Sequence, residues 1–90
     1  MILPTVHTNG TSAQDLFDGY RNAQDAIREA IDTIEKIEFN ARDYYPQGPE
    51  AFQQARSELR AHVVALTAAQ DYFLAVCEHV IDTAKPGSVT

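Results

Sequence analysis

Two long runs of apolar residues, spaced alternately by four and three positions, constrain the fold of this chain most strongly. The first run extends from Leu16 to Ile37, and the second extends from Ala55 to Val80. This spacing aligns the side chains along one stripe of an α-helix. The members are Leu16, Tyr20, Ala23, Ile27, Ala30, Ile34 and Ile37, then Ala55, Leu59, His62, Leu66, Ala69, Phe73, Val76 and Val80. The sequence therefore predicts two helices, over residues 12–38 and 49–84.

Residue types at the ends of both runs are typical of helix termini. Thr11 and Gln14 have the spacing of a capping box, with Thr11 as the N-cap. Gly48 is suited to cap the second helix, with Pro49 at its first position. Asn40 is placed to close the first helix in a left-handed conformation. The residues expected to end the second helix are Lys85, Pro86 and Gly87.

The connection between the two helices is short, so we expect them to be antiparallel neighbours. The predicted fold is an all-α antiparallel helical hairpin in a single domain, 1–90. Residues 1–10 form an N-terminal arm that packs on the end of the second helix, 39–48 form the loop and 85–90 form a tail. Two helices cover each other's apolar stripes poorly. We therefore expect a homo-oligomeric helical bundle, most simply a dimer with four helices.

Composition excludes several functional classes. The chain has 90 residues, a formal net charge of −6 and one cysteine. A duplex nucleic acid is not an expected partner, because proteins that bind it carry a basic face. No apolar run reaches the roughly 18 residues of a membrane span, and no signal peptide is recognisable. The single cysteine excludes an intrachain disulfide, so we expect a cytoplasmic protein. The lack of an apolar run of sufficient length means that we expect no membrane partner.

The predicted loop concentrates chemically versatile side chains. Arg42, Asp43, Tyr44 and Tyr45 follow one another there. Two further arginines lie one helical turn apart near the start of the second helix, Arg56 and Arg60. Arginines beside aromatic rings and a helix N-terminus suit a ligand with a phosphate and a base. The alternative is structural: the tyrosines plug the open end of the hairpin, and Arg42 pairs with Asp43 or Glu50.

A second candidate segment precedes the first helix. It contains His7, Asn9, Thr11 and Ser12, with a glycine at position 10. Polar groups before a helix N-terminus can bind an anion. The alternative is ordinary capping of the helix by Thr11 or Ser12, with a turn at Asn9. In an antiparallel hairpin this segment lies at the end opposite to the loop. In a head-to-tail dimer, the two segments would meet and form composite sites.

Acidic residues on both helices raise the possibility of a metal-dependent enzyme. They are Glu29, Asp32, Glu35 and Glu38 on the first helix, and Glu78 and Asp82 on the second. All-helical nucleotide pyrophosphohydrolases of the MazG and dUTPase-like type bind magnesium through Glu-x-x-Glu and Glu-x-x-Asp pairs on facing helices. Here the spacing of three drifts around the helix, and the second pair is Glu-x-x-x-Asp. We therefore interpret these residues as a solvated face, and expect no metal, no cofactor and no enzymatic activity.

Two further residues have structural interpretations. His62 occupies an apolar stripe, where a hydrogen-bonded core histidine is the expected role; the alternative is a pH-sensitive contact across a two-fold axis. Cys77 is expected to be a small buried apolar residue. The sequence contains no serine-hydrolase signature, no glycine-rich phosphate loop and no zinc pattern.

The segments H-x-N-G-T-S at 7–12 and N-x-R-D-Y-Y-P-Q-G at 40–48 resemble short helical proteins encoded by phages and prophages. The resemblance spans about residues 5–82. It implies a host-cell cytoplasmic setting, and small phage proteins without catalytic motifs often act by stoichiometric binding. Some resemble oligomeric sponges that trap nucleotide immune signals, and others block a defence protein directly. The positions it highlights are His7, Asn9, Thr11, Ser12, Arg42, Asp43, Tyr44 and Tyr45. Helical-hairpin secretion proteins of the WXG type are a poorer comparison, because this chain has no tryptophan.

Two functional hypotheses are preferred, ahead of a third in which the protein is a magnesium-dependent nucleotide hydrolase. In the first, a homo-oligomer holds a phosphorylated or nucleotide-like small molecule at the loop end, with Arg42, Tyr44 and Tyr45 as its main contacts and the N-terminal segment of a neighbour contributing. In the second, the protein is an interaction module whose acidic helical surface inhibits or docks on a host defence protein or a virion protein.

Overall fold

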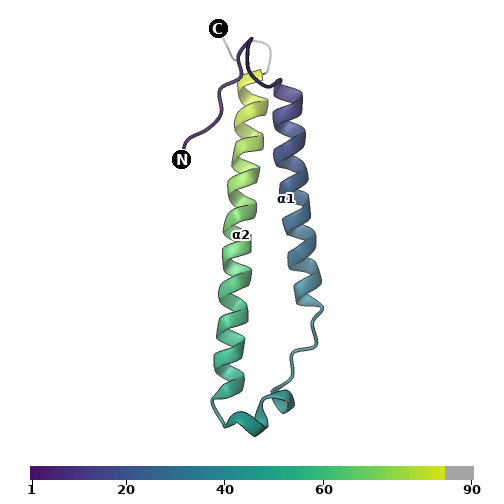
Figure 1. The fold of residues 1–90 in the computed structure, drawn as a ribbon, viewed down its shortest axis with the longest axis vertical. Helices are drawn as coiled ribbons and strands as arrows, with labels where there is room; N and C mark the ends of the chain where they lie inside the picture. Colours follow the sequence, from purple (N-terminus) through teal and green to yellow (C-terminus); the bar gives the residue numbers. More distant parts are fainter. Residues whose placement is uncertain (85–90) are drawn as a thin grey trace.

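A computed structural model describes residues 1–84 of the chain as a helical hairpin (Figure 1). Helix α1 spans Ala13–Glu35 and helix α2 spans Ala51–Ala84. Two short 3₁₀ turns lie between them, η1 (Ala41–Asp43) and η2 (Tyr45–Gln47). The helices lie side by side and run antiparallel in a rod of 64 × 21 × 20 Å. The predicted all-α class and the pairing of two helices are confirmed.

Helix α1 begins one residue later than expected. Ser12, not Thr11, is the N-cap, and its hydroxyl accepts a hydrogen bond from the backbone amide of Asp15 at 3.1 Å. This shift moves Gln14 to the second helical position, from which it cannot complete a capping box. Its side-chain amide instead donates to Asp18 at 2.8 Å.

Helix α1 ends at Glu35, three residues before the predicted end. The amide of Ile37 bonds to the carbonyl of Ile34 at 3.0 Å, so the last turn tightens to a 3₁₀ form. Asn40 is extended, with φ −120° and ψ 137°, and the expectation of a left-handed cap there was wrong. The chain leaves the helix early because Phe39 turns toward α2, where its ring lies 5.2 Å from that of Phe52.

Helix α2 begins at Ala51, two residues later than predicted. Gly48 has φ 114° and closes η2, and its carbonyl accepts a bond from the amide of Ala51 at 3.4 Å. Gly48 therefore ends the loop at η2 and is not the N-cap of α2. The predicted end of the helix at Lys85, Pro86 and Gly87 lies outside the described residues.

The fully buried apolar core is small and lies at one end of the rod. Among the described residues it consists of Val76, Cys77 and Val80. The buried polar side chain is Gln24 of α1. Most other residues of the two predicted stripes are half-buried, because a second helix covers each stripe from one side only. Ala30 and Ile37, which the spacing also placed in a stripe, are exposed.

The N-terminal arm explains why the core lies where it does. The His79 ring donates a hydrogen bond from Nε2 to the carbonyl of Pro4, with a separation of 2.8 Å. Leu3 and Val6 are half-buried, whereas Ile2 is exposed. The arm thus adds a third layer over the last turns of α2, and the predicted packing of the arm on this helix end is confirmed for these residues.

His62 does not lie in the core, so its predicted position was wrong. Its side chain is exposed, and the half-buried neighbour at this level is Val63. Leu59, Val63 and Leu66 continue the spacing of four and three, so the buried stripe passes through Val63 near the loop end. The histidine is consequently on the flank of the helix.

Candidate functional site

Three aromatic rings close the loop end of the hairpin. The ring of Tyr44 lies 5.4 Å from that of Phe39 and 6.1 Å from that of Phe52. Tilted rings at these distances attract one another through their quadrupoles and bury apolar surface. Tyr44 also donates its backbone amide to the carbonyl of Ala41 at 2.9 Å. The geometry therefore agrees with the structural alternative, in which the Tyr44 ring packs into the open end of the hairpin.

The neighbouring residues of the loop face solvent. Tyr45 is 70 % exposed. Arg42 and Asp43 are also exposed. Within residues 1–84, Arg42 forms no ion pair with Asp43 or Glu50, so the pairing considered for it is not observed. These side chains are accessible, but they are not gathered around a common point by any contact.

The two helical arginines lie beside a hollow at this end of the molecule. It has a volume of about 610 Å³, and Arg56, Arg60 and Glu35 are its charged lining residues. The other lining residues are apolar: Ile34, Ile37, Phe39, Leu59 and Val63. We call this feature the loop-end hollow. It exists because α1 stops at Glu35 while α2 continues alongside an extended stretch of chain (Figure 1).

The chemistry of the loop-end hollow is amphipathic. Two guanidinium groups provide up to ten N–H donors, five each, and one carboxylate opposes them. Its volume lies within the roughly 300–1,000 Å³ typical of small-molecule sites. An apolar floor with arginines at the edge suits a ligand that combines a planar or apolar body with a phosphate or carboxylate. Of the predicted site residues, the hollow brings together Arg56 and Arg60 and leaves Arg42, Tyr44 and Tyr45 outside its lining.

The N-terminal candidate segment lies at the other end of the rod. Ser12 is used for capping, and the amide of Gly10 donates to the carbonyl of His7 at 3.1 Å in a turn. The His7 ring lies over this turn, since a Cβ atom built on Gly10 would be 2.6 Å from its Nε2. Asn9 and Thr11 are exposed. Within residues 1–84, no contact brings this segment to the loop, because the two lie at opposite ends of the hairpin.

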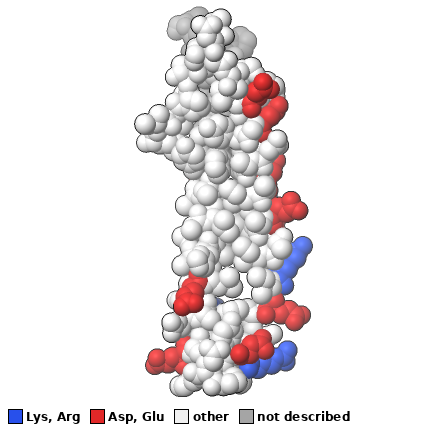
Figure 2. Space-filling view, viewed as in Figure 1, with Lys and Arg blue, Asp and Glu red and all other residues white. Residues whose placement is uncertain are grey.

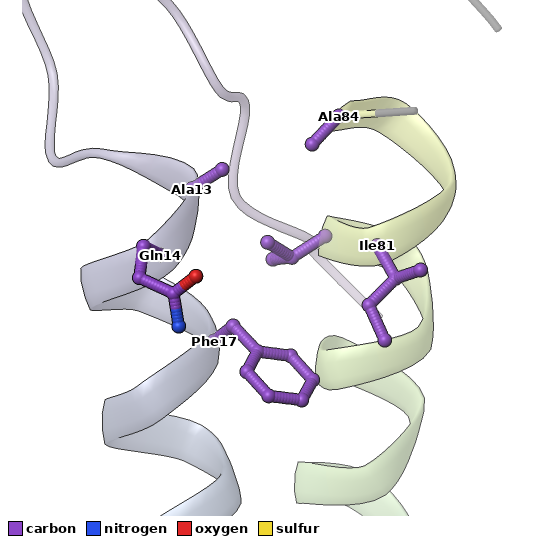
Figure 3. Close-up of a pocket in the computed structure, with 6 residues that line it drawn as sticks. Ala13, Gln14, Phe17, Ile81 and Ala84 are labelled. Atoms are coloured by element: carbon purple, nitrogen blue, oxygen red, sulfur yellow. The ribbon is translucent and has the colours of Figure 1, made fainter. Parts of the chain in front are cut away.

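A smaller hollow of about 230 Å³ lies beside the start of α1 (Figure 3). The ring of Phe17 and the side chain of Ile81 face it from the two helices, and the amide of Gln14 is its main polar group. None of His7, Asn9, Thr11 or Ser12 lines it. This hollow is a gap over the apolar seam, and none of its lining residues among the described ones is charged.

Acidic side chains gather along α1. Figure 2 shows red groups down the α1 edge and around the loop end, and white atoms over most of the visible face of α2. On α1, four exposed acids fall within about 60° of one another on the helix surface. These are Asp18, Asp25, Glu29 and Asp32, called here the acidic row. In the described part of the chain, no three His, Cys, Asp or Glu side chains converge as metal ligands would.

Cys77 lies in the core, where its thiol makes a weak hydrogen bond. Its thiol is directed at the carbonyl of Phe17, with sulfur and oxygen 3.9 Å apart. Burial raises the pKa of the Cys77 thiol above its ordinary value of 9.0, and nearby Arg21 opposes this change. A protonated buried thiol is a poor nucleophile.

Three features near the two candidate sites and in the core between them were not predicted from the sequence. The Phe39–Phe52 contact could have been inferred, because both rings flank the predicted loop. The clamp between His79 and Pro4 joins distant segments, and nothing in the local sequence indicates it. The burial of Gln24 also has no local signal, since a glutamine in a helix is usually exposed.

Comparisons with known proteins do not place this chain in a family. A scan against models of protein families found no match, and neither the curated proteins nor the solved structures gave one. Among the described residues, no helix has the length and apolar character required to span a membrane.

Proposed function

We propose that this chain is a non-enzymatic binding protein that assembles as a homo-oligomer and holds a phosphorylated or nucleotide-like small molecule in the loop-end hollow. The observation that carries the proposal is the placement of Arg56 and Arg60 over an apolar floor of suitable volume. In a chain with a net charge of −6, such a pair of adjacent cations is distinctive. The phage resemblance adds a setting, in which the protein traps a nucleotide immune signal in the host cytoplasm.

The roles of the predicted residues follow from their positions. Arg56 and Arg60 bind the anionic group of the ligand, and Phe39 contributes part of the apolar floor. Tyr44 supports the site by holding the ring of Phe39. Arg42 and Tyr45 are exposed at the same end and are available to a ligand that extends beyond the hollow.

Native mass spectrometry with a panel of cyclic dinucleotides and ADP-ribose derivatives tests this proposal. We expect a discrete oligomer that gains ligand mass in a fixed ratio. Arg56→Ala and Arg60→Ala should each weaken binding about 10- to 100-fold, because each removes charge-assisted hydrogen bonds. Arg28→Ala is the matched control, since Arg28 is an exposed α1 arginine outside the hollow. Arg42→Ala shows whether the loop arginine also reaches the ligand.

Two results would contradict the ligand site. One is an oligomer that takes up none of the panel at concentrations far above those in cells. The other is binding that is equally strong in the Arg56 and Arg60 variants and in the Arg28 control. Either result would shift the weight to the second candidate function.

The second candidate is an interaction module that uses the acidic row of α1. Its supporting observation is the concentration of exposed carboxylates on one helix face (Figure 2). Such a surface suits a basic patch on a host defence protein or a virion protein. Reversing Glu29 and Asp32 to lysine should abolish capture of a specific partner from host lysate, whereas Glu58→Lys on α2 should not. If the variant with Glu29 and Asp32 reversed captured the same proteins as the Glu58→Lys variant, that result would contradict this function.

A further inference from the structure

Helix α2 is apolar on more than the face that α1 covers. Between Arg60 and Glu78 it carries a single formal charge, at Asp71. Val64 is 59 % exposed and Leu74 is 40 % exposed, and both lie in this stretch. A helix with apolar side chains on several faces normally packs against more than one partner. The described chain supplies one neighbouring helix, so part of α2 remains uncovered.

The surface area of the molecule supports this conclusion. The accessible surface is 6865 Å². A monomeric folded protein of 10.0 kDa is expected to expose about 5,200 Å², so this chain exposes about 1,600 Å² more. Its radius of gyration of 19.5 Å likewise exceeds the roughly 12 Å expected for a compact chain of this length. A standard protein–protein interface covers about 800 Å² on each partner. The excess exposed surface of this rod is larger than that area.

A row of exposed residues runs along the uncovered side of α2. Its members alternate in spacing between four and three, so they remain aligned along the helix. They are Arg60, Val64, Thr67, Asp71, Leu74 and Glu78, called here the outer row. The row extends over about 27 Å of helix.

The outer row is complementary to itself when reversed. If a second α2 lies antiparallel, with a two-fold axis at the level of Ala69, then Arg60 opposes the partner's Glu78. In the same register Val64 opposes the partner's Leu74, and Thr67 opposes the partner's Asp71. We propose that the outer row is a homodimer interface, in which α2 packs antiparallel on α2 of a second copy about this axis.

Charge and symmetry favour a second copy over another partner. The antiparallel register joins the basic end of one row to the acidic end of the other twice, as an isologous interface requires. A parallel arrangement would instead place Arg60 beside Arg60 and Glu78 beside Glu78, which is unfavourable. The two Asp71 carboxylates come within about 6 Å of each other along the axis, so this residue weakens the dimer.

The interface also bears on the ligand site. Arg60 borders both the loop-end hollow and the outer row. In the dimer, the hollow of one chain lies at the level of the partner's His79, on which the N-terminal arm is held. The arm residues His7, Asn9 and Thr11 would then lie at the same level along the rod as the loop end of the other chain, as composite sites require. This inference rests on the proposed homo-oligomer but is independent of ligand binding.

Cysteine cross-linking between separately purified Val64→Cys and Leu74→Cys chains tests the register. Upon mixing and treatment with a short bis-maleimide, we expect a covalent product of twice the 10.0 kDa chain mass. Each variant alone should give little product, because identical positions lie about 15 Å apart along the axis. The unmodified chain is the control, since its single thiol at Cys77 is buried.

The possible results distinguish the outer-row interface from homo-oligomer formation in general. A mixture that yields no more product than either variant alone, from a protein that sediments as an oligomer, would overturn the outer-row interface and leave the proposed assembly intact. A protein that sediments as a monomer would overturn both.

Charge reversal provides a second, independent measurement. Arg60→Glu or Glu78→Arg alone should raise the dimer dissociation constant at least about tenfold, because each places like charges in opposition. The double variant should restore it, whereas Arg28→Glu, far from the row, should have little effect. A double variant as weak as the single variants would contradict the register.

Discussion

The Nε2 atom of His79 lies 2.8 Å from the carbonyl oxygen of Pro4, and this hydrogen bond fixes the N-terminal arm on the last turns of α2. The buried core at Val76, Cys77 and Val80 lies at the same end of the rod. A hairpin of two helices has no third element to cover its seam. The arm provides that cover at one end, whereas the three rings of the loop do so at the other.

Removing the His79 side chain should therefore release the arm. In His79→Ala we expect backbone amides of residues 1–10 to exchange with solvent faster, and stability to fall by about 1 kcal/mol from the lost hydrogen bond. Hydrogen-exchange mass spectrometry measures the first effect. His62→Ala is the control, because His62 is exposed on the same helix. Unchanged exchange of the arm in His79→Ala would show that the contact does not hold it.

The adjacent tyrosines of the loop should differ sharply in their effect on stability. Tyr44→Ala removes a ring packed against Phe39 and Phe52, and we expect a loss of about 2 kcal/mol in the free energy of unfolding. Tyr45→Ala should change it by less than about 0.5 kcal/mol, since the ring faces solvent. Urea denaturation followed by circular dichroism measures both. Equal losses would mean that the three-ring cluster does not stabilise the hairpin.

Two glycine substitutions should have opposite signs. Gly48 has φ 114°, a conformation that residues with a Cβ rarely adopt, so Gly48→Ala should destabilise the protein by about 1 kcal/mol or more. Gly19 lies within α1, and a Cβ built there meets no atom within 4 Å. Gly19→Ala should therefore stabilise the helix by about 0.5–1 kcal/mol. Thermal unfolding of the two variants tests the pair, and a shift in the same direction would contradict this account.

Cys77 should make stability depend on pH in the alkaline range. Because burial raises the pKa of its thiol above 9.0 in the folded state, the unfolded state ionises first. Its contribution is fully present below the ordinary pKa and is lost as pH rises through the higher folded-state value. We expect the stability difference between the natural chain and Cys77→Ala to shrink as the pH rises above about 9. A difference that is constant over this range would contradict the burial of the thiol.

The sequence was sufficient to predict the helices because apolar periodicity is a local signal. The end of α1 was predicted too late, since Ile37 continues the spacing although the chain has already turned to bring Phe39 onto Phe52. His62 was misplaced because Leu59, Val63 and Leu66 fit the spacing of four and three as well as Leu59, His62 and Leu66 do, and only the packing on α1 selects Val63. For the site, spacing identified Arg56 and Arg60 as neighbours. It could not indicate the hollow, which depends on where a distant helix stops.

We propose that one hairpin is an incomplete folding unit and that the protein folds as an assembly of two or more copies. Sedimentation equilibrium at micromolar concentration tests it most directly, with far-UV circular dichroism on the same samples to report helix content. We expect a mass that is an integral multiple, two or more, of the 10.0 kDa chain mass. A fully helical species that sediments at 10.0 kDa across the concentration range would contradict the claim.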